Sequence, residues 1–272
     1  MALLVTCLRT SPRFPKLSQN LIRQLGTIDH QEVKQFDQMS TEWWSESGGV
    51  RPLHTMNKLR IPMIRDGLIN EGAVPLINAD SATPLKGLSI LDVGCGGGIM
   101  TEALARLGAT VTGIDASPKI IDVAKQHAAE SQLNINYIAT SIEEYGKLNS
   151  EKFDAVAASE IIEHVTEKEK FLSACSTCLK PSGSIFVTTI NKTFMSELIA
   201  IYFAENILEM IPKGTHHIDK CIEPHKLQRI LEDNNLRTKL VHGMCYNFIT
   251  NNWSWSSNKS ISYGIHAVKI KN

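Results

Sequence analysis

The stretch GLSILDVGCGGGIM (residues 87–100) decides the fold, because an apolar run ends in a cluster of glycines. We expect a buried strand, a tight turn and the immediate start of a helix, since glycine lets the backbone turn sharply and approach a ligand closely. The following TEALARLG (101–108) has helical periodicity, and ATVTGIDAS (109–117) has the composition of a second short strand. A strand, a crossover helix and another strand predict neighbouring parallel strands.

The same alternation continues on the carboxyl side of this unit. Apolar strands are predicted at residues 134–141, 153–160 and 184–191, separated by helices at 118–131 and 167–180. Apolar strands that alternate with helices of ten or more residues are typical of an α/β fold whose parallel sheet is covered on both faces. Two further strands, 237–247 and 260–270, are predicted to close the sheet, and two helices, 31–48 and 54–70, precede it.

The bulk composition predicts one large domain. The chain has 272 residues, 43% of them hydrophobic, and its formal net charge is zero, which argues against a general nucleic-acid binder. It lacks an apolar run of about 18 residues that would span a membrane as a helix. We therefore predict a single domain over residues 29–272, with an N-terminal helical cap (29–75) and an insertion (192–220) near the active site.

Residues 1–28 differ from the rest of the chain. They contain hydroxyl and basic residues but no acid, the basic ones being Arg9, Arg13, Lys16 and Arg23. This composition is typical of a mitochondrial transit peptide and unlike a secretory signal, which needs a longer apolar run. The alternative is an ordinary disordered terminus.

The glycine loop must be distinguished from a dinucleotide-binding loop. The fingerprint GxGxxG would place a third glycine at Ile99, whereas the chain has the spacing GxGxG. Asp115 follows 21 residues after Gly94, at the end of the next predicted strand, where a carboxylate can accept both ribose hydroxyls. Together these features resemble the Rossmann-like S-adenosylmethionine-dependent methyltransferases, whose first motif is matched by Asp92, Gly94, Gly96 and Gly98 and whose ribose-binding acid is matched by Asp115.

That resemblance implies a seven-stranded sheet, mostly parallel with one antiparallel strand. It also implies that S-adenosylmethionine lies across the carboxyl ends of the strands. The alternative for the glycines is an ordinary strand–helix turn, although a turn alone would not need three or four of them.

Further segments resemble the ubiquinone-biosynthesis O-methyltransferases specifically. They are WW (43–44), RPLH (51–54), NKLR (57–60), SEIIEHV (159–165), PKGTH (212–216) and YN (246–247). The resemblance implies O-methylation of a catechol on polyprenyl-dihydroxybenzoate and demethyl-ubiquinol, at the matrix face of the mitochondrial inner membrane, together with other ubiquinone-biosynthesis proteins. It also implies that Arg60, Gly94, Asp115 and Ser159 contact the cofactor, with Arg60 at its carboxylate.

Three residues are candidates for a metal site. Glu160, Glu163 and His164 are spaced i, i+3 and i+4, so on a helix they would share one face. Two carboxylates and an imidazole can bind a divalent cation, Mg²⁺ in preference to Zn²⁺, which would lower the pKa of a catechol hydroxyl. Alternatively, His164 acts as the general base without a metal, or is a structural histidine. His216 is a second candidate for substrate contact or proton transfer.

Residues 194–211 combine apolar side chains with Glu197, Glu205 and Glu209. They are predicted to form an amphipathic helix that either lies on a membrane surface or covers the active site. Two other functions stay open at this stage: a methyltransferase for another small phenol or amine, and a non-catalytic scaffold subunit of a biosynthetic complex.

Overall fold

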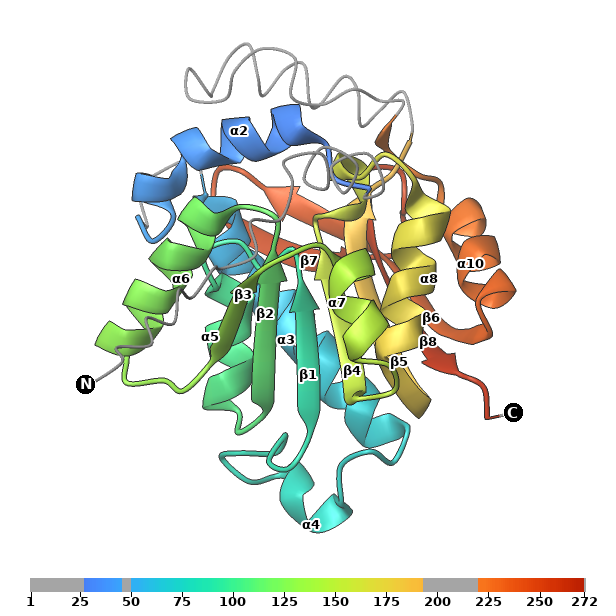
Figure 1. Cartoon of the computed structure of the whole chain (residues 1–272). Helices are drawn as coiled ribbons and strands as arrows, with labels where there is room; N and C mark the ends of the chain where they lie inside the picture. The colour runs from blue at the N-terminus through green and yellow to red at the C-terminus, as the bar shows by residue number, and fades with distance from the viewer. Residues whose placement is uncertain (1–26, 46–49, 193–219, 272) are drawn as a thin grey trace, which may run out of the picture.

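A computed structural model describes residues 27–45, 50–192 and 220–271, which form one sheet covered by helices on both faces (Figure 1). The eight strands of the described residues lie in the order β3-β2-β1-β4-β5-β8-β6-β7. They are β1 (Ser89–Val93), β2 (Thr110–Asp115), β3 (Asn136–Ala139), β4 (Phe153–Ser159), β5 (Leu179–Ile190), β6 (Leu236–Asn247), β7 (Asn252–Ser256) and β8 (Ser262–Lys269).

The helices divide between the two faces of the sheet. They are α2 (His30–Gln38), η1 (Ser40–Glu42), α3 (Arg51–Asn70), α4 (Leu76–Ala79), α5 (Ile99–Arg106), α6 (Pro118–Glu130), α7 (Ile142–Leu148), η2 (Ile162–His164), α8 (Lys168–Cys178) and α10 (Pro224–Asp233). Helices α3 and α5 cover one face, and α7, α8 and α10 cover the other (Figure 1).

Strand β1 shows why the predicted apolar run is continuous. Ile90 belongs to the hydrophobic cluster formed with α3 and α5, whereas its neighbour Leu91 belongs to the cluster formed with α7, α8 and α10. Both side chains are fully buried, and each such burial contributes about 1.5–3 kcal/mol. A strand covered on both faces therefore has no polar alternation.

The α/β methyltransferase-like architecture is confirmed, with two differences in detail. The sheet has eight strands where seven were expected, because the uncharged sequence NWSWS (β7) forms an antiparallel edge strand on β6. Strand β5 begins at Leu179, before the predicted break at PSG, because Leu179 pairs with Phe153 on the neighbouring strand β4. The β propensity of the sequence does not predict the extra strand β7 or the early start of β5, because both depend on pairing with a neighbouring strand.

The range predicted to form an N-terminal helical cap, residues 29–75, contains α2, η1 and α3 among its described residues. Residues 1–26 and 193–219 lie outside the described residues, so the leader up to residue 26, most of the insertion, and His216 are not part of the structural account. Thr27 and Ile28 are described: Ile28 bridges Val165, and Thr27 is buried. Among the described helices, none has the length and apolarity to cross a membrane.

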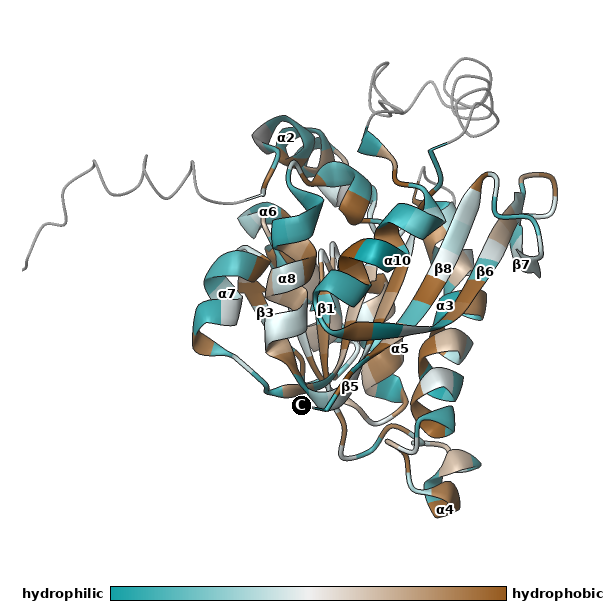
Figure 2. Cartoon of the chain, turned by 90° about the vertical axis from the view of Figure 1, so that its right-hand side faces the viewer, coloured by the Kyte–Doolittle hydropathy of each residue, from teal (hydrophilic) through white to brown (hydrophobic). Residues whose placement is uncertain are grey.

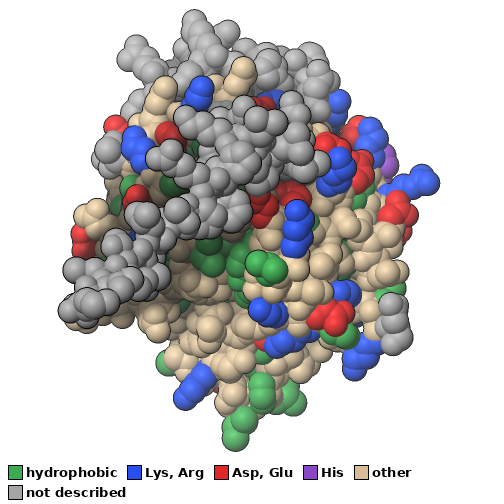
Figure 3. All heavy atoms as spheres, viewed as in Figure 1, with side chains coloured by type: hydrophobic (Ala, Val, Ile, Leu, Met, Phe, Trp, Pro, Cys, Tyr) green, Lys and Arg blue, Asp and Glu red, His purple; other side chains and the backbone are tan. Residues whose placement is uncertain are grey.

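Two apolar pairs are exposed at opposite ends of the molecule. Leu76 and Ile77 in α4 are 82% and 90% exposed, and the space-filling view shows hydrophobic side chains gathered at the lower end, over α4 (Figure 3). Phe248 and Ile249 lie in the turn between β6 and β7, at the opposite end (Figure 2).

Candidate active site

The glycine loop begins where β1 ends at Val93. Gly94, Gly96 and Gly98 all have positive φ angles (71°, 53° and 92°), and Gly98 is the N-cap of α5. Glycine accepts this conformation without steric cost. The prediction of a strand–turn–helix at these positions is confirmed.

Neighbouring side chains also leave no room for a Cβ atom at these glycine positions. A Cβ atom at Gly96 would lie 2.3 Å from Cζ2 of Trp43, and one at Gly97 would lie 2.1 Å from Cδ1 of the same ring. At Gly94 the nearest atom would be Cγ1 of Ile161, at 2.6 Å. The cap therefore packs directly on the loop, a role for the glycines that reasoning from ligand approach alone does not reveal.

Asp115 lies at the end of β2, beside the loop. Its carboxylate accepts hydrogen bonds from the backbone N–H of Gly96 (3.1 Å) and of Ser117 (2.9 Å). Burial raises the pKa of Asp115, and the two backbone hydrogen bonds oppose that rise. The structure thus joins the predicted ribose-binding acid to the glycine loop by a direct hydrogen bond.

Asp92 and Arg60 form the polar base of the pocket. Asp92 accepts a 2.6 Å hydrogen bond from the Thr101 hydroxyl, and burial raises its pKa to about 6. Arg60 is only 5% exposed, so it is a buried cation and not a solvated residue on the helix surface. Burial lowers the pKa of Arg60 to about 10, and the charges of Asp92 and Glu160 oppose this change.

The guanidinium of Arg60 is held by three contacts. Nε donates to Oδ1 of Asn57 (2.6 Å), Nη1 to Oγ of Ser159 (3.0 Å) and Nη2 to the carbonyl of Leu53 (3.0 Å). Ser159 is also within 2.7 Å of the Thr188 hydroxyl. Ser159 therefore joins the cap helix α3 to the carboxyl ends of β4 and β5.

The segment after β4 is not the helix expected for the metal ligands. Glu160 has a φ of 53° and its backbone N–H donates to Thr188, so it precedes a 3-10 helix of only three residues, Ile162–His164. The i, i+3, i+4 argument for a shared helical face is therefore wrong, because this short 3-10 turn has a different pitch. Within the described ranges, no group of three or more His, Cys, Asp or Glu residues is arranged to hold a metal.

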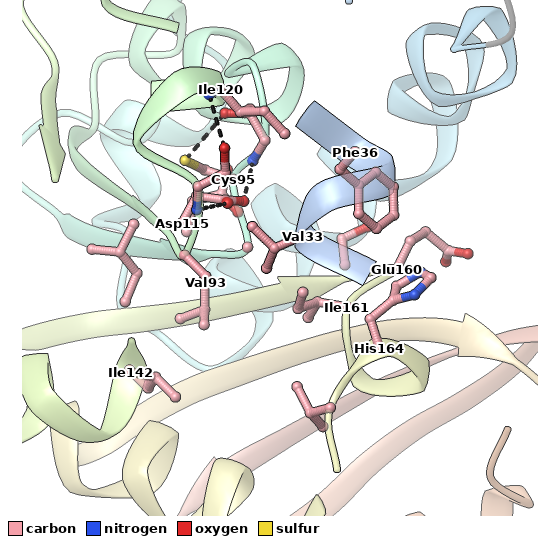
Figure 4. Close-up of a pocket in the computed structure, with 18 of the residues that line it drawn as sticks. Val33, Phe36, Val93, Cys95, Asp115, Ile120, Ile142, Glu160, Ile161 and His164 are labelled. Carbon is pink, nitrogen blue, oxygen red and sulfur yellow. Dashed lines mark hydrogen bonds between the residues drawn. The ribbon is translucent and has the colours of Figure 1, made fainter. Parts of the chain in front are cut away.

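The two carboxylates of this segment nevertheless influence each other. Burial raises the pKa of Glu160 to about 7, with the charge of Glu163 adding to the rise. Oε1 of Glu160 is buried and has no hydrogen-bond partner among the described atoms, whereas Glu163 accepts a 2.9 Å bond from Thr189. Glu160 is thus a buried acceptor with unused capacity, facing the pocket (Figure 4).

His164 has a partner that sequence reasoning missed. Its Nδ1 lies 3.2 Å from Oε2 of Glu32, and Oε1 of Glu32 accepts a 2.7 Å bond from Lys220. Burial by itself lowers the pKa of His164, but the hydrogen bond to Glu32 and the nearby carboxylates outweigh burial and raise it. Glu32 lies 132 residues away on α2, and only the folding of the cap onto the sheet shows the pairing.

One pocket contains most of the predicted residues. Its lining includes Arg60, Asp92, Gly94, Gly96, Asp115, Ser159, Glu160 and His164. Gly98 and Glu163 are not in the lining. Figure 4 shows Asp115 at one end of the pocket, Glu160 and His164 at the other, and the α2 side chains Val33 and Phe36 above the gap. A cofactor held at the Asp115 end would therefore extend towards His164.

Comparison with known proteins identifies methyltransferases among the similar sequences and structures. Residues 91–187 match the family model described as a methyltransferase domain. The chain is 43% identical over 269 residues to the mitochondrial ubiquinone biosynthesis O-methyltransferase of Rattus norvegicus, covering 98% of this chain and 77% of the rat protein. It is 42% identical over 239 residues to the ubiquinone biosynthesis O-methyltransferase of Rhizobium leguminosarum bv. trifolii, covering 88% of this chain and 93% of the bacterial protein.

The chain belongs to the ubiquinone biosynthesis O-methyltransferase family. As a member of this family it is an S-adenosylmethionine-dependent methyltransferase. The fold is also that of the magnesium protoporphyrin IX methyltransferase of Synechocystis PCC 6803, solved with bound S-adenosylhomocysteine, with a TM-score of 0.62 at 18% identity over 92% of this chain and 99% of that one.

Proposed function

We propose that the chain transfers a methyl group to a catechol oxygen of a lipid-tailed ubiquinone precursor, a polyprenyl-dihydroxybenzoate or a demethyl-ubiquinol. The observation that carries this proposal is the shared pocket, in which the glycine loop and Asp115 lie at one end and the Glu32–His164 pair at the other. The names of the rat and bacterial relatives support the substrate class.

The roles of the residues follow from their positions. Asp115 accepts the ribose hydroxyls, and the loop at Gly94 and Gly96 admits the cofactor backbone. The buried cation of Arg60, beside Ser159, attracts the carboxylate at the methionine end. These contacts aim the methyl sulfonium towards the far end of the pocket, where positioning is the main source of acceleration.

The reaction then needs one proton acceptor. An oxygen lone pair of the catechol attacks the methyl carbon, the carbon–sulfur bond breaks, and sulfur keeps the electron pair as S-adenosylhomocysteine. The hydroxyl proton passes to the ring nitrogen Nε2 of His164, while Glu32 holds Nδ1 and stabilises the imidazolium that forms. Phe36, whose ring centroid is 5.0 Å from that of His164, limits its rotation.

A divalent cation is the alternative to His164 as the base. The described side chains of Glu160, Glu163 and His164 are not arranged to hold a metal, so they would have to move together to bind it. The buried, unpartnered Oε1 of Glu160 favours this alternative, because a cation would offset the repulsion from Glu163. Oxygen donors favour Mg²⁺ over Zn²⁺. When bound, the cation would lower the pKa of the catechol hydroxyl.

The setting of the reaction is proposed from the relatives and the leader. The rat relative is named mitochondrial, which supports a mitochondrial location for this chain. Within the mitochondrion, the proposed site of action is the matrix face of the inner membrane, with peripheral membrane contact and with other ubiquinone-biosynthesis proteins as partners. Thr27 is 2% exposed and donates a 2.6 Å hydrogen bond to Glu143. We therefore expect cleavage of the leader before Thr27, which N-terminal sequencing of the mature protein would reveal.

A methyl-transfer assay tests the proposed reaction. The full chain is incubated with S-adenosylmethionine and a short-tailed demethyl-ubiquinol, with and without a chelator and added Mg²⁺ or Zn²⁺, and mass spectrometry detects the methylated ring. Loss of methylation on chelation, restored by metal, supports the cation. Methylation that is unchanged by the chelator leaves His164 as the base and removes the cation from the proposal.

A pair of histidine variants makes the assay specific. His164→Ala should lower the rate roughly 100-fold or more, the usual contribution of a general base. The matched control is His225→Ala, because His225 is exposed on α10 and should be replaceable without effect. Absence of any methylated catechol, despite demonstrated cofactor binding, would contradict the proposed substrate.

A further inference from the structure

The β6–β7 hairpin has an unusual composition. Residues 240–258 contain no Lys, Arg, Asp or Glu, although charged residues make up 21% of the chain, and they include Tyr246, Phe248, Trp253 and Trp255. Trp and Tyr favour a boundary between water and an apolar phase, because each combines an apolar ring with a polar group. An edge hairpin without charges also lacks the usual protection against association with other surfaces.

The tip of this hairpin presents apolar side chains to solvent. Ile249 is 81% exposed, Phe248 is 51% exposed, and Trp255 on the edge strand is 36% exposed. Single exposed hydrophobic residues are common, but an adjacent exposed pair at a protruding turn, on a hairpin that also carries a partly exposed tryptophan, is characteristic of an interaction site.

The backbone that carries these side chains is firmly held. Oδ1 of Asn247 accepts hydrogen bonds from the N–H groups of Ile249 (3.0 Å) and Thr250 (3.2 Å), and the Tyr246 hydroxyl donates to Asn251 (2.8 Å). Trp253 Nε1 donates to the Pro52 carbonyl (3.0 Å), which fastens the hairpin to α3. A tip whose conformation is set before binding loses little conformational entropy when it is buried.

Two cations lie beside the turn end of the hairpin. Lys58 donates a 3.0 Å hydrogen bond to Asn252, which pairs with Asn247 next to the turn, and Arg51 precedes Pro52, whose carbonyl accepts the hydrogen bond from Trp253. Both are exposed residues of α3, and neither has a carboxylate within ion-pair distance in the part of the chain that the structure describes. Cations without a described carboxylate partner, beside an uncharged apolar tip, match the anionic head groups above a hydrocarbon layer.

The tip of the hairpin lies on the same side of the molecule as the pocket. It lies at the same end of the molecule as α2, which covers the pocket, and at the opposite end from α4 (Figure 2). A membrane touched by the tip would therefore lie on the pocket side, where a lipid-tailed ring has the shortest path to His164.

We infer that the β6–β7 hairpin is a membrane-docking element: Phe248 and Ile249 enter the interface of a bilayer, while Arg51 and Lys58 contact anionic lipid head groups. This inference rests on the proposed function only for its purpose, the supply of a lipid-tailed substrate. The docking itself is independent of the reaction.

Co-flotation of the full chain with vesicles of phosphatidylcholine and phosphatidylglycerol tests the inference. Ile249→Asp should lower the vesicle partition coefficient by about tenfold or more. The matched control is Ile77→Asp, the same substitution at a 90% exposed isoleucine at the other end of the molecule, and it should leave partition unchanged. Replacing both Arg51 and Lys58 with Gln should lower partition by roughly thirtyfold on these vesicles, and not on phosphatidylcholine alone.

Each result decides the question. A loss confined to Ile249→Asp and the cation variant, with unchanged melting temperature and cofactor affinity, supports docking through the hairpin. Equal effects at Ile249 and Ile77, no effect at either, or no vesicle binding by the unmodified chain would overturn it, the last leaving this face for a protein partner. Vesicle binding without methylation of any catechol would contradict the proposed function alone.

Discussion

Replacing Gly96 with alanine tests whether the glycine loop is shaped by the cap as well as by the cofactor. The new Cβ would lie 2.3 Å from Cζ2 of Trp43, and the residue would keep a φ of 53°. The left-handed conformation costs about 1–2 kcal/mol for a residue other than glycine, and overpacking a buried site costs about 1–3 kcal/mol. We therefore expect Gly96→Ala to lower the free energy of unfolding by about 2–5 kcal/mol.

Gly72 provides a matched control for the cost of the left-handed backbone conformation. Gly72 also has a positive φ, 74°, but a Cβ there would meet no atom within 4 Å. Gly72→Ala should therefore cost only the conformational part, about 1–2 kcal/mol. Urea denaturation of both variants measures the two costs, and the Gly96 variant should also melt at least about 4 °C lower than the unmodified chain.

A double-mutant cycle isolates the contact with the ring. In a Trp43→Ala background the obstructing atoms are absent, so the cost of Gly96→Ala should fall by about 1–3 kcal/mol, to that of Gly72→Ala. The reasoning would be refuted if Gly96→Ala cost no more than Gly72→Ala in the unmodified chain. It would equally be refuted if removal of the Trp43 ring did not change the cost.

Three further predictions concern ionisable groups. Asp115→Asn should weaken S-adenosylmethionine binding roughly 10- to 100-fold in calorimetric titration, because hydrogen bonds to a charged group are worth about 1.5–3 kcal/mol; unchanged affinity would contradict its role at the ribose. The pKa of His164 is raised and a general base must be neutral, so the rate of methyl transfer should increase with pH through a value above 6.5. Glu32→Gln should move this rising part of the pH–rate profile to lower pH. An unchanged profile would contradict the pairing of Glu32 with His164. Burial lowers the pKa of His266 to about 4, so the unfolded chain takes up the proton first, and the fold loses about 2 kcal/mol between pH 7 and pH 5 from this group. His266→Gln, which retains a partner for Ser184 without titrating, should remove that component in urea denaturation at the two pH values.

The local features of the fold could be predicted from the sequence because they depend on neighbours along the chain. The glycines after Val93 require a turn wherever that strand lies, and Ile90 and Leu91 in succession require cover on both faces. Asp115 could be predicted at the site because the carboxyl ends of parallel strands meet at one edge of the sheet. Hydrophobic periodicity predicted only an α/β fold, whereas the family motifs predicted the reaction, O-methylation.

The cap and the acid–base arrangement were decided only by the tertiary structure. The contact of Trp43 with Gly96 and the pairing of Glu32 with His164 join segments that are far apart in the sequence. A local sequence pattern does not predict contacts between such segments. The helical spacing assumed for Glu160 and His164 failed because a 3-10 turn after β4, set by the Glu160–Thr188 hydrogen bond, replaced the helix. Sequence thus determined which groups could carry the chemistry, whereas packing of the cap on the sheet decided which of them are buried together and therefore which pKa values are shifted.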